Sequence, residues 1–290
     1  MNKLILTFLV LIGFSNALNA QLLWKISGKG LKNPSYLFGT HHLIPTSFLD
    51  SVPGLFKAFN SCNTVVGEMV TSNIEGTVRI QQAAVMPNHI KISDLLDSEE
   101  FALVDKELRA TLKFSLGDVA ALNPALLLTM YELELYKKQT GYKESIPLDS
   151  YFQIIAEEKE REVIGLETVD QQISFLFGSK DMERQADILI ESVRNKDKLL
   201  KEIVKMNALY KSGAVNELVK LAKGSGDAYS LTEEEYVKLV DKRNAAWLTK
   251  LPDMMTKSSC FIAVGAMHLG GANGLVKQLQ KAGYKVKAVK

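Results

Sequence analysis

The sequence predicts an α/β fold whose one sheet is built from the N- and C-terminal segments, with a large, mainly helical insertion between them. Short apolar runs typical of strands occur near both ends of the chain, between 22 and 68 and between 260 and 289. From about 94 to 256, apolar residues recur mostly at spacings of three and four, the helical period. No Pro-rich linker marks a boundary, so residues 21–290 are expected to form one domain.

The first twenty residues have the pattern of a secretory signal peptide. Lys3 supplies a positive charge, and Leu4 to Phe14 form an apolar run too short to span a bilayer. Ser15 to Ala20 then offer small residues for cleavage. No later segment reaches about 18 apolar residues without a charge. We therefore expect export, periplasmic or secreted, with no stable membrane span after cleavage. A retained N-terminal anchor is the alternative.

Capping and turn residues place the individual elements. Glycines and an Asn-Pro pair between the first two runs predict a hairpin. Asp97 and Glu100 form a capping box, and Asn123 and Thr232 are typical helix caps. The expected elements, in chain order, are strands at 22–27 and 35–39, a helix at 52–60, a strand at 64–68, helices at 101–112, 124–138 and 148–160, a strand at 162–167, helices within 169–255 including one at 232–251, a strand at 260–264, a helix at 272–282 and a strand at 284–289.

Composition excludes some classes of partner. The formal net charge is +2, and no basic stripe interleaved with aromatic residues occurs, so neither nucleic acid nor a membrane surface is expected as a partner. The sequence carries no signal for the oligomeric state. Cys62 and Cys260 both precede strand-like runs. In an oxidising compartment they could form a disulfide if those strands are neighbours, or they could be two buried thiols; both alternatives stay open.

One phrase, an apolar run followed by Gly-x-x-His-Leu, occurs twice. In "SYLFGTHHLIP", His42 follows Gly39, and in "FIAVGAMHLGG", His268 follows Gly265. Ligand sites in open α/β sheets form beyond the carboxyl ends of strands, where a glycine lets the backbone approach a ligand closely. If the two strands are neighbours, both imidazoles converge on one point. Two imidazoles and a carboxylate would then make a site for a divalent metal.

Glu68 is the carboxylate candidate, because it closes the apolar run "NTVVGE" and a charged group there needs a partner. Glu167 closes a similar run, although taken alone it favours a structural ion pair. His41 adjoins His42 and should point to the opposite side of an extended chain, so we assign His42 to the site. His89 lies in a polar "PNH" turn and is expected at the surface.

At these residues the chain resembles the TraB/GumN family, which takes in the pheromone-shutdown proteins. The family is related to the Tiki-type metalloproteases, and its fold is thought to be shared with erythromycin-esterase-like hydrolases. The landmarks are "LLWKISG", "SYLFGTHHLIP", "VVGEM", "IGLETVDQQ", "DKRNAAWL" and "FIAVGAMHLGGANGLVKQLQKAGYKV", which cover nearly all of residues 21–290. Two departures are His41, where the family usually has an apolar residue, and Met69, where an acid often stands.

The resemblance implies a hydrolase site made of both Gly-x-x-His motifs and a Glu, that is His42, His268 and Glu68. It also implies a divalent metal, with Mn²⁺ or Co²⁺ favoured over Zn²⁺. Arg243 and Asn244 match the family's Arg-Asn pair and could help to bind an oxyanion or a substrate carboxylate.

We therefore expect an exported metal-dependent hydrolase that acts on a peptide or protein substrate. His42, Glu68 and His268 would hold the ion, and Glu68 or Glu167 would accept the proton from water. Two alternatives stay open. One is a protein that sequesters a peptide without cutting it, and the other is a metal-free hydrolase with a histidine as general base.

Overall fold

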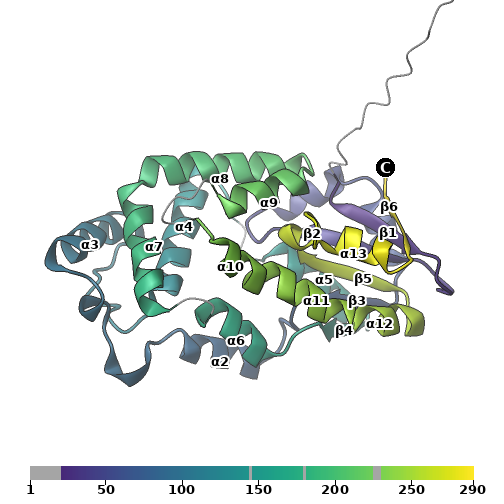
Figure 1. The fold of residues 1–290 in the computed structure, drawn as a ribbon, viewed down its shortest axis with the longest axis horizontal. Coiled ribbons are helices and arrows are strands. Elements are labelled where there is room, and N and C mark those ends of the chain that lie inside the picture. Colours follow the sequence, from purple (N-terminus) through teal and green to yellow (C-terminus); the bar gives the residue numbers. More distant parts are fainter. Residues whose placement is uncertain (1–20, 144–145, 179–180, 225–229) are drawn as a thin grey trace, which may run out of the picture.

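A computed structural model describes residues 21–143, 146–178, 181–224 and 230–290. The predicted signal peptide, residues 1–20, lies outside the described residues. The sheet occupies one end of the molecule, and a group of long helices occupies the other (Figure 1). No helix in the described part of the chain is long and apolar enough to cross a membrane.

Both ends of the chain build the sheet, as predicted. Its spatial order is β4-β3-β5-β2-β1-β6. The four strands β2, β5, β3 and β4 are parallel, whereas β1 is antiparallel to β2 and to β6. The strands are β1 (Leu23–Ser27), β2 (Ser35–Thr40), β3 (Thr64–Gly67), β4 (Glu162–Gly165), β5 (Cys260–Gly265) and β6 (Lys285–Ala288). One edge strand, β4, comes from within the helical insertion, so that section also contributes to the sheet.

Successive residues of the central strands alternate between two apolar cores, because side chains on a strand point to opposite faces. In β3, Val65 belongs to the core beneath α1 (Leu55–Asn60) and α5 (Leu148–Glu158), whereas Val66 belongs to the core beneath α11 (Lys242–Leu248), α12 (Leu251–Lys257) and α13 (Leu275–Lys281). The sheet is therefore covered on both faces, as parallel sheets require.

The remaining helices form the other end of the molecule and the link to it. Their own apolar core contains buried Leu127, Tyr131 and Leu189. The Tyr210 hydroxyl donates to the Gly39 carbonyl at 2.8 Å and ties this section to the end of β2. These helices are α2 (Ile74–Ala83), α3 (Ser98–Leu112), α4 (Pro124–Thr140), α6 (Val169–Phe177), α7 (Met182–Arg194), α8 (Lys196–Lys211), α9 (Val215–Lys223) and α10 (Glu233–Tyr236).

Two helix predictions needed correction, and one helix was not predicted. The helix expected at 52–60 starts only at Leu55, as the short α1, because Gly54 before it adopts a left-handed φ of 70°; a separate 3-10 turn, Thr46–Ser51, precedes it. The helix expected at 232–251 starts at the predicted cap but contains a π-helical turn, Val237–Asp241. The helix that was not predicted is α2, which begins at an Asn73 cap.

Cys62 and Cys260 are both buried and are free thiols. Cys260 starts β5 at the point where it pairs with Thr64 of β3, so the strands they precede are neighbours. Burial raises the pKa of the Cys62 thiol to about 12 and that of Cys260 to about 11. Of the two alternatives, the described structure contains the buried thiols, which are poor nucleophiles at neutral pH.

Candidate functional site

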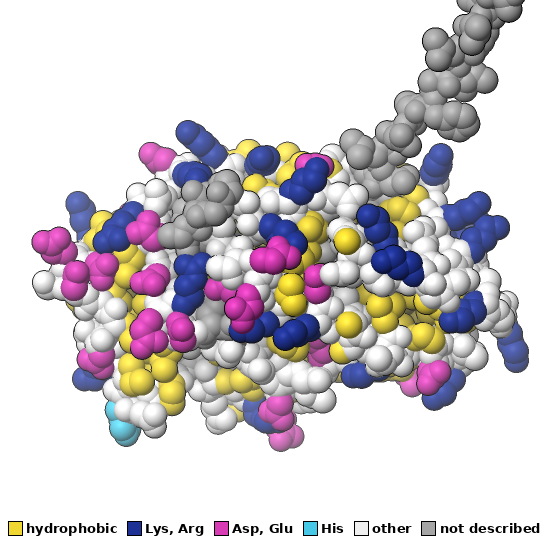
Figure 2. Space-filling model, viewed as in Figure 1, with side chains coloured by type: hydrophobic (Ala, Val, Ile, Leu, Met, Phe, Trp, Pro, Cys, Tyr) yellow, Lys and Arg dark blue, Asp and Glu magenta, His cyan; other side chains and the backbone are white. Residues whose placement is uncertain are grey.

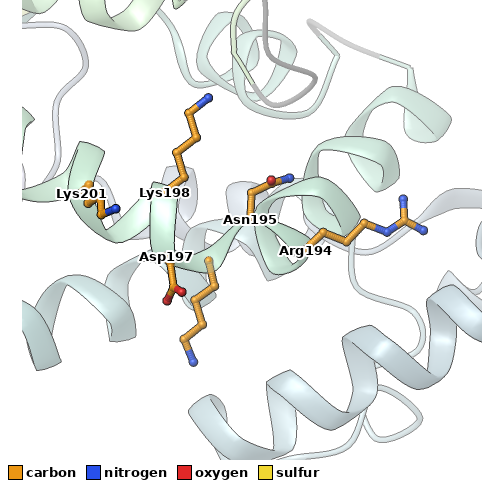
Figure 3. Close-up of a pocket in the computed structure, with 6 residues that line it drawn as sticks. Arg194, Asn195, Asp197, Lys198 and Lys201 are labelled. Atoms are coloured by element: carbon orange, nitrogen blue, oxygen red, sulfur yellow. The ribbon is translucent and has the colours of Figure 1, made fainter.

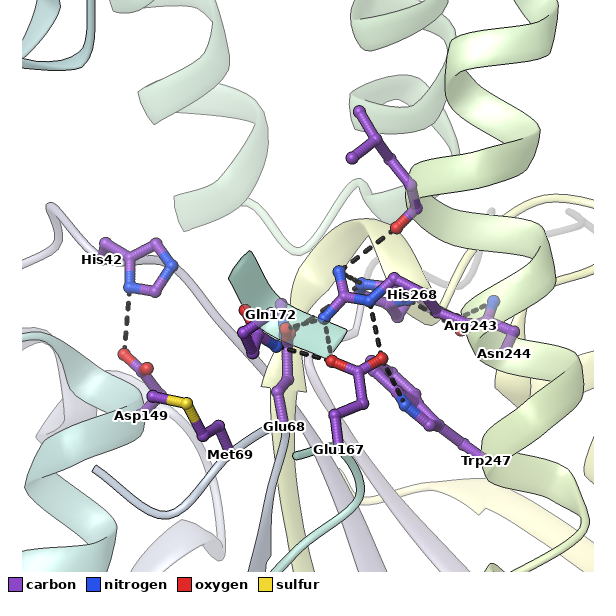
Figure 4. A network of polar contacts seen from close by, with 12 residues as sticks. His42, Glu68, Met69, Asp149, Glu167, Gln172, Arg243, Asn244, Trp247 and His268 are labelled. Atoms are coloured by element: carbon purple, nitrogen blue, oxygen red, sulfur yellow. Dashed lines mark hydrogen bonds and ion pairs between the residues drawn. The ribbon is translucent and has the colours of Figure 1, made fainter. Parts of the chain in front are cut away.

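Four of the predicted site residues lie at one edge of the sheet. The parallel strands β2, β3, β4 and β5 end there, and His42, Glu68, Glu167 and His268 follow those ends directly (Figure 4). This is the edge at which open α/β sheets place ligands. The predicted neighbour relation of β2 and β5 is confirmed, since Gly39 pairs with Val264.

Glu68 is the most exposed carboxylate of the buried cluster, with 25% of its side chain accessible. Its Oε1 accepts the Gly265 N–H at 2.8 Å, and its Oε2 accepts from Arg243 Nη2. Burial would raise the pKa of Glu68, but the ring of His268 when it is protonated, the charge of Arg243 and these hydrogen bonds lower it to about 2. Since His268 is neutral at pH 7, Arg243 is the charge that keeps Glu68 ionised there.

Arg243 uses all five of its N–H groups inside the protein. Nε and Nη2 donate to the two oxygens of Glu167 at 2.8 Å each, and Nη2 also donates to Glu68. Nη1 donates to the Leu239 carbonyl at 3.2 Å and to His268 Nε2 at 3.2 Å. Its guanidinium also lies 5.0 Å from the ring centre of Phe175. Arg243 is therefore a fixed, buried cation with no donor left for an oxyanion in this arrangement.

Glu167 is held even more tightly. Its side chain is 4% exposed and accepts four hydrogen bonds. Two come from Arg243, one from Trp247 Nε1 at 2.8 Å and one from Gln172 Nε2 at 2.5 Å. Both carboxylate oxygens are therefore occupied by donors of the protein. This geometry fits the structural ion pair considered from the sequence.

Asn244 fixes the tautomer of His268. The Asn244 amide donates to the carbonyls of His268 at 3.2 Å and Asn273 at 3.0 Å, so its oxygen must face the ring. That oxygen lies 2.7 Å from His268 Nδ1, which therefore carries the proton. Nε2 keeps its lone pair and accepts from Arg243. Burial lowers the pKa of His268 to about 4, so the ring is neutral at pH 7.

A π-helical turn delivers this pair of residues to the sheet edge. Val237–Asp241 immediately precedes α11, whose first turn carries Arg243 and Asn244. Such turns are frequent at functional sites because the extra residue rotates the side chains that follow. The carbonyl of Leu239 within the turn accepts directly from Arg243.

Glycines bring the strand ends close to their neighbours. A Cβ on Gly67 would lie 2.4 Å from Gln153 Nε2, and a Cβ on Gly39 would lie 3.0 Å from the Ala266 Cα. Gln153 in turn holds the loop after Glu68, donating to the Met69 carbonyl at 2.9 Å. Gly39 of the repeated phrase therefore allows close packing against the turn that carries His268, whereas the sequence predicted a close approach to a ligand.

His42 faces a different partner. Its Nδ1 donates to Asp149 Oδ1 at 3.0 Å, at the start of α5. The side chain is 71% exposed, and its second ring nitrogen points toward the side where Glu68 lies (Figure 4). The hydrogen bond to Asp149 and the charges of Asp149 and Glu68 raise the pKa of His42, although water screens groups this exposed.

The predicted convergence of the two imidazoles is corrected by these contacts. His42 turns to α5, which covers one face of the sheet, and His268 turns to α11, which covers the other. The strands are neighbours, but the two rings bond to different helices, with Glu68 between them (Figure 4). Among the described residues no group of three or more His, Cys, Asp or Glu side chains is placed to hold a metal ion.

A divalent metal does not fit this donor set as it is arranged. The lone pair of His268 Nε2 is directed at Arg243, and both Glu68 oxygens already accept hydrogen bonds. The guanidinium supplies the positive charge that an ion would otherwise bring to these groups. Binding an ion at His42, Glu68 and His268 would require Arg243 to leave.

Sequence reasoning missed Asp149 and Trp247. Asp149 lies 107 positions from its partner His42, and its only local signal is a place in the first turn of a predicted helix. Trp247 stacks with its ring centre 4.3 Å from that of His268. His41, left out of the site, accepts the Leu43 N–H and lies beside Tyr210, with 5.2 Å between ring centres.

One surface cavity lies away from the charged cluster, and another adjoins it. One of about 380 Å³ sits between α7 and α8 and is lined by charged residues (Figure 3). Its Arg194 and Lys196 are already paired with acids, Arg194 with Glu100 and Glu191 and Lys196 with Glu107. The other, of about 410 Å³, adjoins the cluster, and its lining includes Gly165, Glu167 and Thr168.

Comparison with known proteins gives one match. A model of the TraB/PrgY/gumN family matches residues 22–288. No curated protein and no solved structure matches the chain.

Proposed function

Because the chain belongs to the TraB/PrgY/gumN family, we propose that it is a hydrolase of peptide or protein substrates, with its site at the carboxyl edge of the sheet. The observation that carries the proposal is the His42–Asp149 pair beside an ionised Glu68. An imidazole oriented by a carboxylate is a recurring acid–base unit in hydrolases. This is the alternative of a metal-free hydrolase with a histidine as general base, which the sequence left open.

The chemistry assigned to His42 is proton transfer. Asp149 accepts the Nδ1 proton, so Nε2 has a free lone pair on its exposed side once the ring is neutral, and because the pKa of His42 is raised to about 9 this base form gains population as the pH rises toward that value. Nε2 takes a proton from a water molecule as its oxygen attacks the substrate carbonyl, and later returns the proton to the leaving amine or alcohol. The positive charge that forms on the ring is stabilised by Asp149 and Glu68.

The buried cluster keeps this environment fixed. Arg243 keeps Glu68 ionised at the edge of the sheet. Glu167 accepts from Arg243, and Trp247 donates to Glu167, so these two residues keep Arg243 in place. Charges that are oriented before the reaction need no reorganisation during it. We propose that Glu68 contributes by its charge and not by taking the proton, because a carboxyl with a pKa near 2 is a weak base.

The test is turnover of a peptide library by the purified protein, measured with and without a chelator. His42→Gln should lower the rate about 10²- to 10⁴-fold, the usual contribution of a general base. His89→Gln, at an exposed turn, is the matched control and should leave turnover unchanged. Asp149→Asn should lower the rate while preserving the fold. Uptake of about one peptide per protein without cleavage would reject hydrolysis and support sequestration.

Metal dependence is the form that the family resemblance implies, and we keep it as a second proposal with its own test. It requires His42, Glu68 and His268 to exchange their present partners for an ion. Loss of hydrolysis on chelation, restored by Mn²⁺ or Co²⁺, would support it over the metal-free form.

We also propose that the protein is exported, on the signal-peptide pattern of residues 1–20. The N-terminus of protein recovered from the native periplasmic or extracellular fraction should begin near Gln21. An N-terminus at Met1 in that material would contradict cleavage.

A further inference from the structure

The strand β4 forms an open edge of the sheet beside the candidate site. Leu166 N–H donates to the Gly67 carbonyl at 3.0 Å, just past the point where Gly67 pairs with Gly165. In a parallel ladder a residue uses its N–H and its carbonyl on the same side, and alternate residues face the other side. Val163 and Gly165 therefore present their N–H and carbonyl groups outward. Outside the β3–β4 ladder, no hydrogen bond to either residue occurs within the described ranges.

The two edges of the sheet differ in how they are protected. The opposite edge strand, β6, carries exposed Lys285 and Lys287, a common device against unwanted strand pairing. Lys and Arg side chains gather at that end of the molecule (Figure 2). The outward part of β4 has only Val163, Ile164 and Gly165, all half-buried and uncharged.

The charged residues at the start of β4 are bonded to groups of the protein. Glu162 accepts from the Thr64 hydroxyl at 3.2 Å, and Arg161 donates to the carbonyls of Phe59 at 2.8 Å and Cys62 at 3.1 Å. Glu162 and Arg161 therefore have partners within the protein, and no charged side chain occurs from Val163 to Gly165. The backbone groups of this strand are left available to an incoming chain.

The edge continues into the site. Gly165, the last residue of β4, lines the cavity of about 410 Å³ that also contains Met69, Thr168 and Glu167. Glu167 is bonded to Arg243, which is bonded to Glu68. A chain extended along β4 would run from the edge into this cavity and toward the charged cluster.

We propose that β4 binds the main chain of an extended peptide as an added strand and so directs substrate into the candidate site. The substrate class is then a segment without folded structure, recognised mainly by its backbone. The proposal rests on the proposed hydrolase function. Two outward residues are too few for a stable interface with a second copy of this chain, but they are enough to orient a substrate.

The probe is the capped hexapeptide acetyl-Thr-Val-Thr-Val-Thr-Val-amide, titrated into ¹⁵N-labelled protein. Saturable shifts are expected at the amides of Val163 and Gly165. A peptide N-methylated at every residue should bind at least tenfold more weakly, because it lacks amide donors. A peptide N-methylated at every second residue keeps one complete hydrogen-bonding edge and is the matched control, expected to bind within about twofold.

Val163→Pro removes one outward N–H while leaving the ladder side intact, a substitution that edge strands tolerate. It should weaken both peptide binding and peptide turnover tenfold or more. Equal binding of the fully methylated peptide, or shifts at β6 instead of β4, would overturn the proposal. Concentration-dependent shifts at Val163 without peptide would assign the edge to a second copy and also overturn it.

The outcomes separate this proposal from the hydrolase itself. Peptide bound at β4 without any cleavage would leave the added-strand proposal standing and reject the hydrolase. Normal turnover by the Val163→Pro protein would reject the added strand and leave the hydrolase standing.

Discussion

At the scale of single residues, Arg243 determines the character of the site. It donates hydrogen bonds to two carboxylates, Glu68 and Glu167, and to the lone pair of His268 Nε2. A buried cation with all its donors used is fixed in one orientation, because any rotation would leave a charged group unpaired. The cluster is consequently a rigid, charged group of side chains on one side of the exposed His42 (Figure 4).

Arg243→Lys tests whether Arg243 fixes the buried cluster. Lysine cannot reproduce the five-donor fork, so it would leave buried carboxylate oxygens without partners and lower the free energy of unfolding by about 3–5 kcal/mol. Urea denaturation measures the change. Arg79→Lys, which alters the exposed ion pair with Asp170, is the control and should change the free energy of unfolding by about 1 kcal/mol or less. Equal effects of both substitutions would contradict the buried role of Arg243.

His268 should make stability fall as the pH drops. Burial lowers the pKa of His268, and also of His41, to about 4, so between pH 6.5 and 4 only the unfolded chain binds these protons. The free energy of unfolding should decrease through this range by up to about 3 kcal/mol for each ring. The contribution of Glu68, whose pKa is lowered, is lost only below its ordinary value of 4.5.

The measurement is urea unfolding of the wild type and of His268→Gln at several pH values from 7 to 4.5. The variant should show a clearly smaller slope, with His41→Gln as a second comparison. His42 does not interfere, because a histidine with a raised pKa is protonated in both states below pH 6.5. An unchanged slope in His268→Gln would mean that this ring is not held neutral.

At the scale of elements, the close approach of strand ends and turns sets the geometry of the edge. The 3-10 turn Ala266–His268 packs directly over Gly39 of β2, and Tyr210 of α8 bonds to the same residue's carbonyl. Three separate segments therefore meet at one glycine. The position of His268 depends on this contact.

Gly39→Ala should disturb the contact. The new Cβ would lie 3.0 Å from the Ala266 Cα and 3.1 Å from a Leu269 methyl carbon, so backbone must move. We expect a loss of about 1–3 kcal/mol in the free energy of unfolding, the usual cost of overpacking. Gly117→Ala is the control, because its nearest neighbour would be the Ser115 hydroxyl at 3.6 Å. A neutral Gly39→Ala in thermal or urea unfolding would contradict the tight packing.

At the scale of the whole molecule, the sheet and the inserted helices share the site. β2, β3 and β5 supply His42, Glu68 and His268, while the insertion supplies Asp149, Glu167 and the Arg243–Asn244 pair. Neither part could make the site alone, because every predicted site residue from the terminal segments is bonded to a residue of the insertion.

The response of the whole protein to metal ions separates the two forms of the proposed hydrolase. With Arg243 between Glu68 and His268, addition of Mn²⁺, Co²⁺ or Zn²⁺ should leave Tm unchanged. An ion bound only by the folded state at 100 times its Kd would stabilise it by about 2.7 kcal/mol, which raises Tm measurably. A rise that disappears in His42→Ala would establish the metal-dependent form and reject the arrangement seen at Arg243.

The sequence by itself determined the architecture. Short apolar runs at both ends predicted the terminal strands, and the capping residues Asp97, Asn123 and Thr232 marked helix starts that the structure confirms. These features depend on neighbours along the chain, so local patterns contain them. The repeated Gly-x-x-His phrase likewise located the edge of the sheet where the charged residues gather.

Only the tertiary structure decided how those residues are paired. His42 turns to Asp149 and His268 to Asn244, on helices that cover opposite faces of the sheet. The direction of a turn after a strand is set by what packs against it, and the partners lie 107 and 24 positions away. Spacing along the chain therefore predicted which residues gather at this edge of the sheet, while the packing of α5 and α11 determined which partners they bond to.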